Sequence, residues 1–288
     1  MSIDLLQEKI RKLKNPSMVD LTLNVSDLPP QLRTGNGAQD YARFCKELLT
    51  ALKGLVPAIR VSFSAFALLS GMTELSEVLR CAEDLGYYSV MDAPYILSPM
   101  MASMAADIIF GEDTVYPCDG LIIPSYPGTD CIRPFLPYVK NQKKDLFVVV
   151  RTSNKSAPEL QDLMTGTRLV HMAAADLVNR FGEENRGRCA YSRVSVLAGA
   201  NSAGSLNALR TKYPELFLLM DDMDYTGCNA KTCSAGFDRF GHGAAVCAGP
   251  LITMAWEQAG SDGRDYLEQA TAAAERMKKN LTRYVTVL

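Results

Sequence analysis

The sequence lacks the features that mark several large classes of protein. Its 288 residues carry a formal net charge of −2, so no basic excess argues for nucleic acid or an anionic membrane as a partner. No apolar run approaches the roughly 20 residues of a membrane-spanning helix. The opening stretch, MSIDLLQEKIRKLKN, has no signal-peptide core and instead spaces Ile3, Leu6, Ile10 and Leu13 as on an amphipathic helix. We therefore expect a cytoplasmic protein.

Histidines are few, and the cysteines follow no framework. The two histidines, His171 and His242, pair with no serine or cysteine in a pattern typical of nucleophilic catalysis. His242 lies between two glycines, which favours a turn. The eight cysteines are scattered, so we expect free thiols in a reducing compartment. Cys228 and Cys233 are the one close pair, and their C-x₄-C spacing is weak evidence for zinc because no second pair follows.

Linkers, low-complexity segments and charge runs are also absent, which predicts one domain over residues 1–288. Short apolar runs alternate with helical patterns, as in βα units. The strand candidates are 17–23, 58–64, 87–92, 120–124, 146–152, 192–198, 216–220 and 244–248. The helix candidates that separate and follow them are 38–55, 73–85, 99–110, 129–141, 158–163 with 170–181, 203–212, 230–240 and 262–281. This alternation favours the α/β class and a (β/α)₈ TIM barrel, with an open doubly wound sheet as the alternative.

Several stretches are similar to the bacterial type 2 branch of orotidine 5′-phosphate decarboxylase. They include ALKGLVPAIRVSFSAF, LGYYSVMDA, VVVRTSNKSAPELQDL and FDRFGHGAAVCAGPLITMAW, and they are spread along most of the chain. The resemblance implies a barrel that is usually a homodimer, converts orotidine monophosphate to UMP and needs no cofactor. It also implies an array of aspartates and lysines, with a D-x-K-x-x-D motif after the third strand. The lysine ammonium stabilises the developing carbanion and then protonates it.

The catalytic motif implied by the resemblance is broken in this chain. Asp92 begins it, but Pro94 stands at the lysine position and Leu97 at the second aspartate. Proline has no side-chain proton to give, and leucine has no charge. A shift of register cannot restore the motif, because residues 54–139 contain no lysine. Asp92 is then either a relic binding residue or a solvated strand-end carboxylate, and we favour the second interpretation.

Two further positions at the first strands have changed type. Thr22 stands where the family has a ribose-binding aspartate, and Arg60 where it has a lysine. Arginine keeps the positive charge but is a poor proton donor, since its pKa lies above about 12. Arg60 either binds an anionic ligand or neutralises Asp20 or Asp92. We favour the internal ion pair, because an unpaired charge there would be costly.

Polar residues survive at the fifth strand end. Ser153 and Asn154 match the element that contacts the pyrimidine ring in the family, although capping of the next turn is an equal alternative. After the eighth strand the family's phosphate-binding arginine is replaced by Pro250. Ser153 and Asn154 are thus candidates for ligand binding, with turn capping left open, and we expect a weakened phosphate site.

The loop after the seventh strand has become acidic. Residues 221–228 read DDMDYTGC where the family has a glycine-rich phosphate loop, and Thr226 is the ligand-binding candidate left in it. Carboxylates there would repel a phosphate dianion. Asp221, Asp222 and Asp224 either hold a divalent cation through oxygen ligands, with Asp92 opposite, or form a solvated loop, which we favour.

The leading hypothesis is a member of the decarboxylase family that is inactive or strongly impaired. It would act by binding a nucleotide or pyrimidine-like molecule, or as the partner of an active homologue. One alternative is decarboxylation of orotidine monophosphate in pyrimidine biosynthesis, as the framework implies. Another is altered, metal-assisted chemistry at the aspartate cluster. A homodimer is expected, with no cofactor, nucleic acid or membrane.

Overall fold

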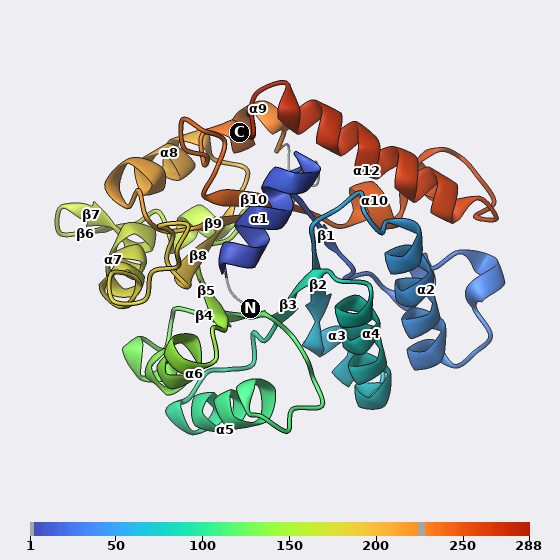
Figure 1. Ribbon diagram of the computed structural model, residues 1–288, viewed down its shortest axis with the longest axis horizontal. Helices are drawn as coiled ribbons and strands as arrows, with labels where there is room; N and C mark the ends of the chain where they lie inside the picture. Colours follow the sequence, from blue (N-terminus) through green and yellow to red (C-terminus); the bar gives the residue numbers. More distant parts are fainter. Residues whose placement is uncertain (1–2, 224–227) are drawn as a thin grey trace.

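Parallel strands close into a barrel in the computed structural model, which describes residues 3–223 and 228–288. Within these residues, eight strands run in the closed order β1-β10-β9-β8-β5-β4-β3-β2, and all neighbours are parallel (Figure 1). They are β1 Ser17–Asp20, β2 Ala58–Ser62, β3 Tyr88–Asp92, β4 Gly120–Pro124, β5 Asp145–Arg151, β8 Val194–Gly199, β9 Leu218–Asp221 and β10 Ala244–Ala248. The predicted (β/α)₈ barrel is therefore confirmed, and the open sheet is wrong.

Helices surround the barrel and bury their apolar faces against it (Figure 1). The longer ones are α2 Gly37–Ala51, α4 Met72–Asp84, α5 Pro99–Phe110, α7 Val170–Gly182, α8 Ala203–Lys212 and α12 Tyr266–Thr282. Shorter ones are α3 Phe63–Leu68, α6 Leu136–Asn141, α9 Ala230–Ser234, α10 Pro250–Thr253 and α11 Ala255–Gln258. The helix predicted over 230–240 is wrong beyond Ser234. The chain turns there because Gly236 packs against Met220, where a Cβ atom would come within 2.5 Å of the sulfur.

The amphipathic helix α1, Ile3–Leu13, lies across the end of the barrel where the strands begin (Figure 1). Of the predicted stripe, Ile3, Leu6 and Ile10 are fully buried, and Leu13 is half-buried. Gln7, on the same face, accepts a hydrogen bond from the backbone N–H of Gly243, just before β10. The beginning of the chain therefore seals one end of the barrel, and only the other end is available as a mouth.

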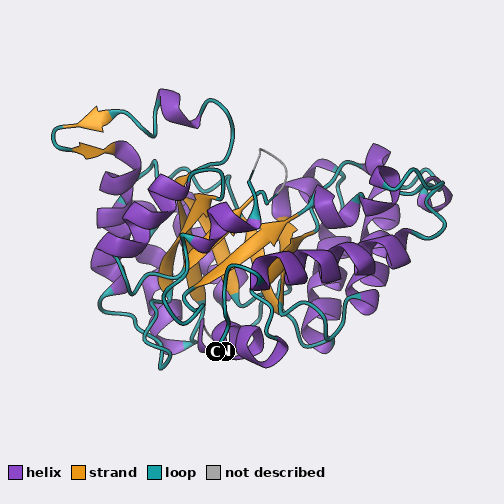
Figure 2. Ribbon diagram, turned by 90° about the horizontal axis from the view of Figure 1, so that it is seen from above, coloured by secondary structure: helices purple, strands orange, loops and turns teal. Residues whose placement is uncertain are grey.

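A hairpin stands beyond the mouth. It consists of β6, Met164–Thr165, and β7, Arg168–Leu169, and Figure 2 shows it projecting from one end of the barrel, with both termini at the other. The helix predicted over 158–163 is wrong: the 3₁₀ turn η5, Ala157–Glu159, leads into this hairpin. None of the helices in residues 3–223 and 228–288 combines the length and apolar content needed to cross a membrane.

Candidate functional site at the barrel mouth

Arg60, on β2, forms the centre of the mouth. Its Nη2 contacts Oδ2 of Asp92 at 2.7 Å, and its Nη1 contacts Oδ1 of Asp221 at 2.8 Å and Oδ2 of Asp20 at 3.5 Å. The guanidinium is largely buried, with 12% of the side chain exposed. The predicted internal ion pair is thus confirmed, and it is wider than predicted, because three strands each supply a carboxylate.

The parallel register explains this convergence. Asp20 pairs with Arg60 across β1 and β2, and Asp92 ends β3 on the other side of β2. Asp221 ends β9, across the barrel from β2. Since strand ends meet at one rim of a closed barrel, side chains distant in sequence face the same interior space.

Negative charge exceeds positive charge in this cluster. With Asp222 beside Asp221, four carboxylates face the single guanidinium of Arg60. Burial alone would lower the pKa of Arg60, but the surrounding carboxylates raise it well above its usual range. Burial raises the pKa of Asp20 although Arg60 opposes this, and burial together with Asp221 raises the pKa of Asp222. The mouth therefore disfavours any further negative charge.

Ser153 lies at the end of β5 and faces Asp222. Its hydroxyl donates to the carboxylate of Asp222, whose backbone adopts a left-handed φ of 64°. Ser153 is buried, with 5% exposed, whereas Asn154 is exposed. Gly199 allows the backbone of Ser153 to approach β8, since a Cβ there would lie 2.7 Å from the Ser153 N and Cα atoms. Of the two predicted ring-binding residues, the structure brings only Ser153 into the acidic cluster.

A hydrogen-bonded network holds Ser153 in place. Arg151 donates from Nε and Nη2 to the carboxylate of Asp162, at 3.0 and 2.9 Å, and from Nη1 to Asn201 Oδ1 at 3.0 Å. Asn201 in turn donates to the backbone carbonyl of Ser153. His171 lies 3.0 Å from the same aspartate, so this predicted helix residue supports the network. Asp162 and Asn201 were not singled out from the sequence, although Asp162 lies in the stretch VVVRTSNKSAPELQDL and Asn201 follows the end of β8 by two residues.

A cavity of about 720 Å³ opens beside the cluster, between the segments that follow β1, β2 and β10. Asp20, Thr22, Asp27, Asp222 and Pro250 are among its lining residues. None of the described residues that line it carries a positive charge. Thr22 and Pro250 thus face a space large enough for a small organic ligand, but that space is acidic.

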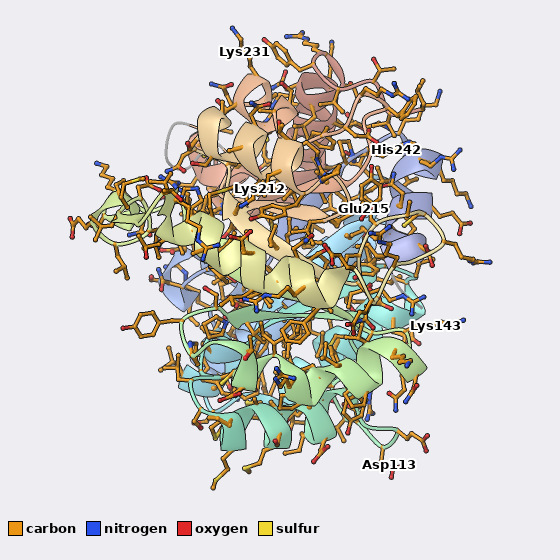
Figure 3. The ribbon with its side chains drawn as sticks, turned by 90° about the vertical axis from the view of Figure 1, so that its left-hand side faces the viewer. Asp113, Lys143, Lys212, Glu215, Lys231 and His242 are labelled. Atoms are coloured by element: carbon orange, nitrogen blue, oxygen red, sulfur yellow. The ribbon has the colours of Figure 1, made fainter. Side chains whose placement is uncertain are left out.

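The other predicted positions take no part in the cluster. Pro94 is exposed, and Leu97 is 63% exposed at the surface. Asp224 and Thr226 lie outside the described residues. His242 lies with Lys143 and Glu215 toward the end of the barrel away from the hairpin, between glycines in the left-handed region, so the predicted turn is confirmed (Figure 3).

Metal-ligating groups combine differently from the prediction. Among the described residues, Asp221 groups with Asp20 and Cys247, whose ligand atoms all lie within 4.8 Å of one another. Asp222 is not part of that group because its carboxylate binds Ser153. Cys247 was expected from the sequence only as a free buried thiol. Its place in the eighth strand, beside the acidic end of the seventh strand, is the sequence feature that would have indicated it as a metal ligand.

Comparison with known proteins places this site in context. No protein-family model matches the chain. An orotidine 5′-phosphate decarboxylase of Rhodopirellula baltica is 26% identical over 277 residues, covering 93% of this chain and 92% of that protein. One of Clostridium kluyveri is 27% identical over 287 residues, covering 98% and 97%. The solved OMP decarboxylase of Leishmania donovani has a TM-score of 0.71 at 22% identity, covering 97% of this chain and 99% of that one. The chain is therefore related to the orotidine 5′-phosphate decarboxylases over nearly its whole length, as its motifs predicted.

Proposed function

We propose that this chain is an orotidine 5′-phosphate decarboxylase-family barrel that binds a pyrimidine-like molecule at its mouth and has lost most or all decarboxylase activity. The environment of Arg60 carries the proposal. This residue stands at a family lysine position, and its guanidinium is held by Asp20, Asp92 and Asp221. The other lysine position is Pro94, which is exposed.

Decarboxylation leaves a carbanion that must be stabilised and protonated. An ammonium group can do both, and such proton transfer contributes about 10²–10⁴-fold to a rate. Arg60 cannot replace it, because the carboxylates raise the pKa of Arg60 further and its charge is already neutralised. A phosphate would also meet Asp222, and two like charges 4 Å apart repel by about 4 kcal/mol at an effective dielectric of 20.

The test is an assay of the purified chain with orotidine monophosphate, measuring formation of UMP. We expect a rate at least about 10³-fold below that of the Rhodopirellula baltica relative measured alongside, given the missing proton donor. A double variant, Pro94→Lys with Leu97→Asp, restores the motif and should raise the rate, while Leu97→Asp alone should not. A rate comparable with that of the relative would contradict the proposal.

The alternative is the reaction named by the relatives, decarboxylation of orotidine monophosphate in pyrimidine synthesis. Similarity over 93% and 98% of the chain supports it. Thermal unfolding in the presence of uridine and of UMP further distinguishes an impaired, pyrimidine-binding barrel from an active decarboxylase. We expect uridine to stabilise the chain more than UMP does, because the mouth is acidic. Ser153→Ala should weaken uridine binding, and the exposed Ser156→Ala serves as its control.

We also propose a second copy of this chain as the partner, through the outer face of α5. Exposed Leu97, Met100, Met104 and Ile108 form an apolar stripe there, and Asp107 is the helix's one charged residue. A helix that is apolar all round is typical of one covered on both faces. Sedimentation should show a dimer that Met104→Lys dissociates, whereas Met164→Lys on the hairpin should not. A monomeric native chain would contradict this.

A further inference from the structure

Three adjacent strands each place one potential metal ligand at the floor of the mouth. Asp20 ends β1, Cys247 lies near the end of β10 and Asp221 ends β9, and these strands are neighbours in the order β1-β10-β9. One carboxylate oxygen of each aspartate and the Sγ atom of Cys247 lie within 4.8 Å of one another. The ligands therefore come from the rigid barrel wall and not from a flexible loop.

Cys247 is the feature that distinguishes this trio from an ordinary acidic cluster. The residue is 1% exposed, and no hydrogen bond joins its thiol to another residue of the described chain. The sulfur nevertheless faces two carboxylates within 4.8 Å. An unpartnered thiol held beside two oxygen ligands is a donor set that a thiophilic cation can use.

The charges around the trio also favour a cation. Among the described residues, Arg60 is the only positively charged side chain that contacts these carboxylates. It also forms an ion pair with Asp92. Each carboxylate has two oxygens, so the guanidinium can keep one while an ion takes the other. Carboxylates that bridge an ion and a second hydrogen-bonding group are common in metal sites.

We propose that Asp20, Asp221 and Cys247 form a binding site for a thiophilic divalent cation of the Zn²⁺ type, with Arg60 holding the two carboxylates from outside. Zinc bonds of about 2.0–2.3 Å in a tetrahedral arrangement separate ligand atoms by roughly 3.3–3.8 Å, so small side-chain rotations would close the trio on an ion. The fourth position would face the mouth. The thiol loses its proton to solvent when the metal–sulfur bond forms.

This site differs from the predicted one in both ligands and metal. From the sequence, a divalent cation bound through the oxygens of Asp221, Asp222 and Asp224, as a hard cation such as Mg²⁺ is, was the alternative to a solvated loop. The structure diverts Asp222 to Ser153 and brings Cys247 and Asp20 to Asp221 instead. A thiolate is a poor ligand for Mg²⁺, which prefers oxygen. The proposal does not depend on which organic ligand the mouth binds or on whether decarboxylation occurs.

The experiment is a titration of the reduced, metal-free chain with Cd²⁺, a spectroscopic stand-in for Zn²⁺. We expect one equivalent per chain to bind and to produce the ultraviolet charge-transfer absorption of a cadmium–thiolate bond. Zn²⁺ should displace it, and a tenfold excess of Mg²⁺ should not. Cys247→Ser should abolish the absorption, whereas Cys131→Ser, an equally buried cysteine outside the trio, should leave it unchanged.

A second variant keeps the proposal testable if Cys247→Ser does not fold. Asp221→Asn retains the thiol but removes one carboxylate, and it should weaken Cd²⁺ binding at least tenfold. Absence of Cd²⁺ binding to the reduced chain would overturn the proposal. Absorption that persists in Cys247→Ser would assign the ion to another cysteine and would overturn it equally, as would unchanged affinity in Asp221→Asn.

Discussion

Replacing Arg60 by methionine should destabilise the protein strongly, because it removes the one positive charge shared by three carboxylates. Methionine keeps an unbranched stem but is shorter than arginine and carries no charge. The guanidinium contacts Asp92, Asp221 and Asp20 at 2.7, 2.8 and 3.5 Å, and 12% of its side chain is exposed. Its loss leaves these carboxylates to repel one another in a mostly buried site.

The size of the effect follows from these contacts. One pair of unit charges about 4 Å apart interacts by about 4 kcal/mol at an effective dielectric of 20. Desolvation of the guanidinium and repulsion among the carboxylates offset much of the attraction summed over the three contacts. Removal of one partner from a buried ionic group costs about 3–5 kcal/mol, so we expect Arg60→Met to lower the free energy of unfolding by that amount near pH 8.

The loss should depend on pH with a defined sign. Burial raises the pKa values of Asp20 and Asp222, and Arg60 opposes that rise, so in Arg60→Met these pKa values lie further above the unfolded value of about 3.9. The loss of unfolding free energy from these raised pKa values is absent below the unfolded pKa, and it grows as the pH rises through the folded-state pKa values. The difference in unfolding free energy between wild type and Arg60→Met should therefore be smaller at pH 5 than at pH 8.

Urea unfolding with a chelator present measures this difference. Arg43→Met is the control, since Arg43 is 57% exposed and pairs with Glu47 on the surface, where such pairs are worth about 1 kcal/mol or less. Asp92→Asn should destabilise wild type but stabilise the Arg60→Met variant, because it then removes an uncompensated charge. Equal midpoints for wild type and Arg60→Met, or the same effect of Asp92→Asn in both, would refute the reasoning.

Three further substitutions test other parts of the structure. Asp145 is fully buried and accepts a hydrogen bond from Tyr88, and burial raises its pKa. The contribution of this carboxyl to stability is therefore lost as the pH rises. Asp145→Asn should flatten the profile of unfolding free energy between pH 5 and 9, and parallel profiles for the two proteins would contradict this. Arg151→Gln should cost about 2–3 kcal/mol through loss of the Asp162 contacts, and it should weaken uridine binding by releasing Asn201, which holds the Ser153 carbonyl. Unchanged binding in calorimetry would exclude the positioning role. Gly199→Ala should cost about 1–3 kcal/mol in urea unfolding, because its Cβ would meet backbone at 2.7 Å; a neutral change would show that the Ser153 segment moves easily.

Local patterns were sufficient to predict the fold and the defect in the catalytic motif. Apolar runs of strand length, separated by helical periodicity, specify βα units, and two of the eight strands, β4 and β10, have the predicted bounds. The motif that begins at Asp92 has lost its lysine wherever its exact register lies, since residues 54–139 contain none. Local pattern was insufficient for residues 158–163, PELQDL, because Leu160 and Leu163 are spaced as on a helix although the chain there forms a 3₁₀ turn that leads to the hairpin.

Tertiary structure alone decided which side chains meet. Closure of the barrel makes β1 and β10 neighbours, and this pairing brings Asp20 to Cys247, 227 positions apart in the numbering of the chain. Adjacent aspartates also separate: Asp221 turns to Arg60, while the left-handed backbone of Asp222 sends its carboxylate to Ser153. The sequence predicts which charges occupy the mouth, but their partners depend on barrel closure and on single backbone angles, which no local periodicity encodes.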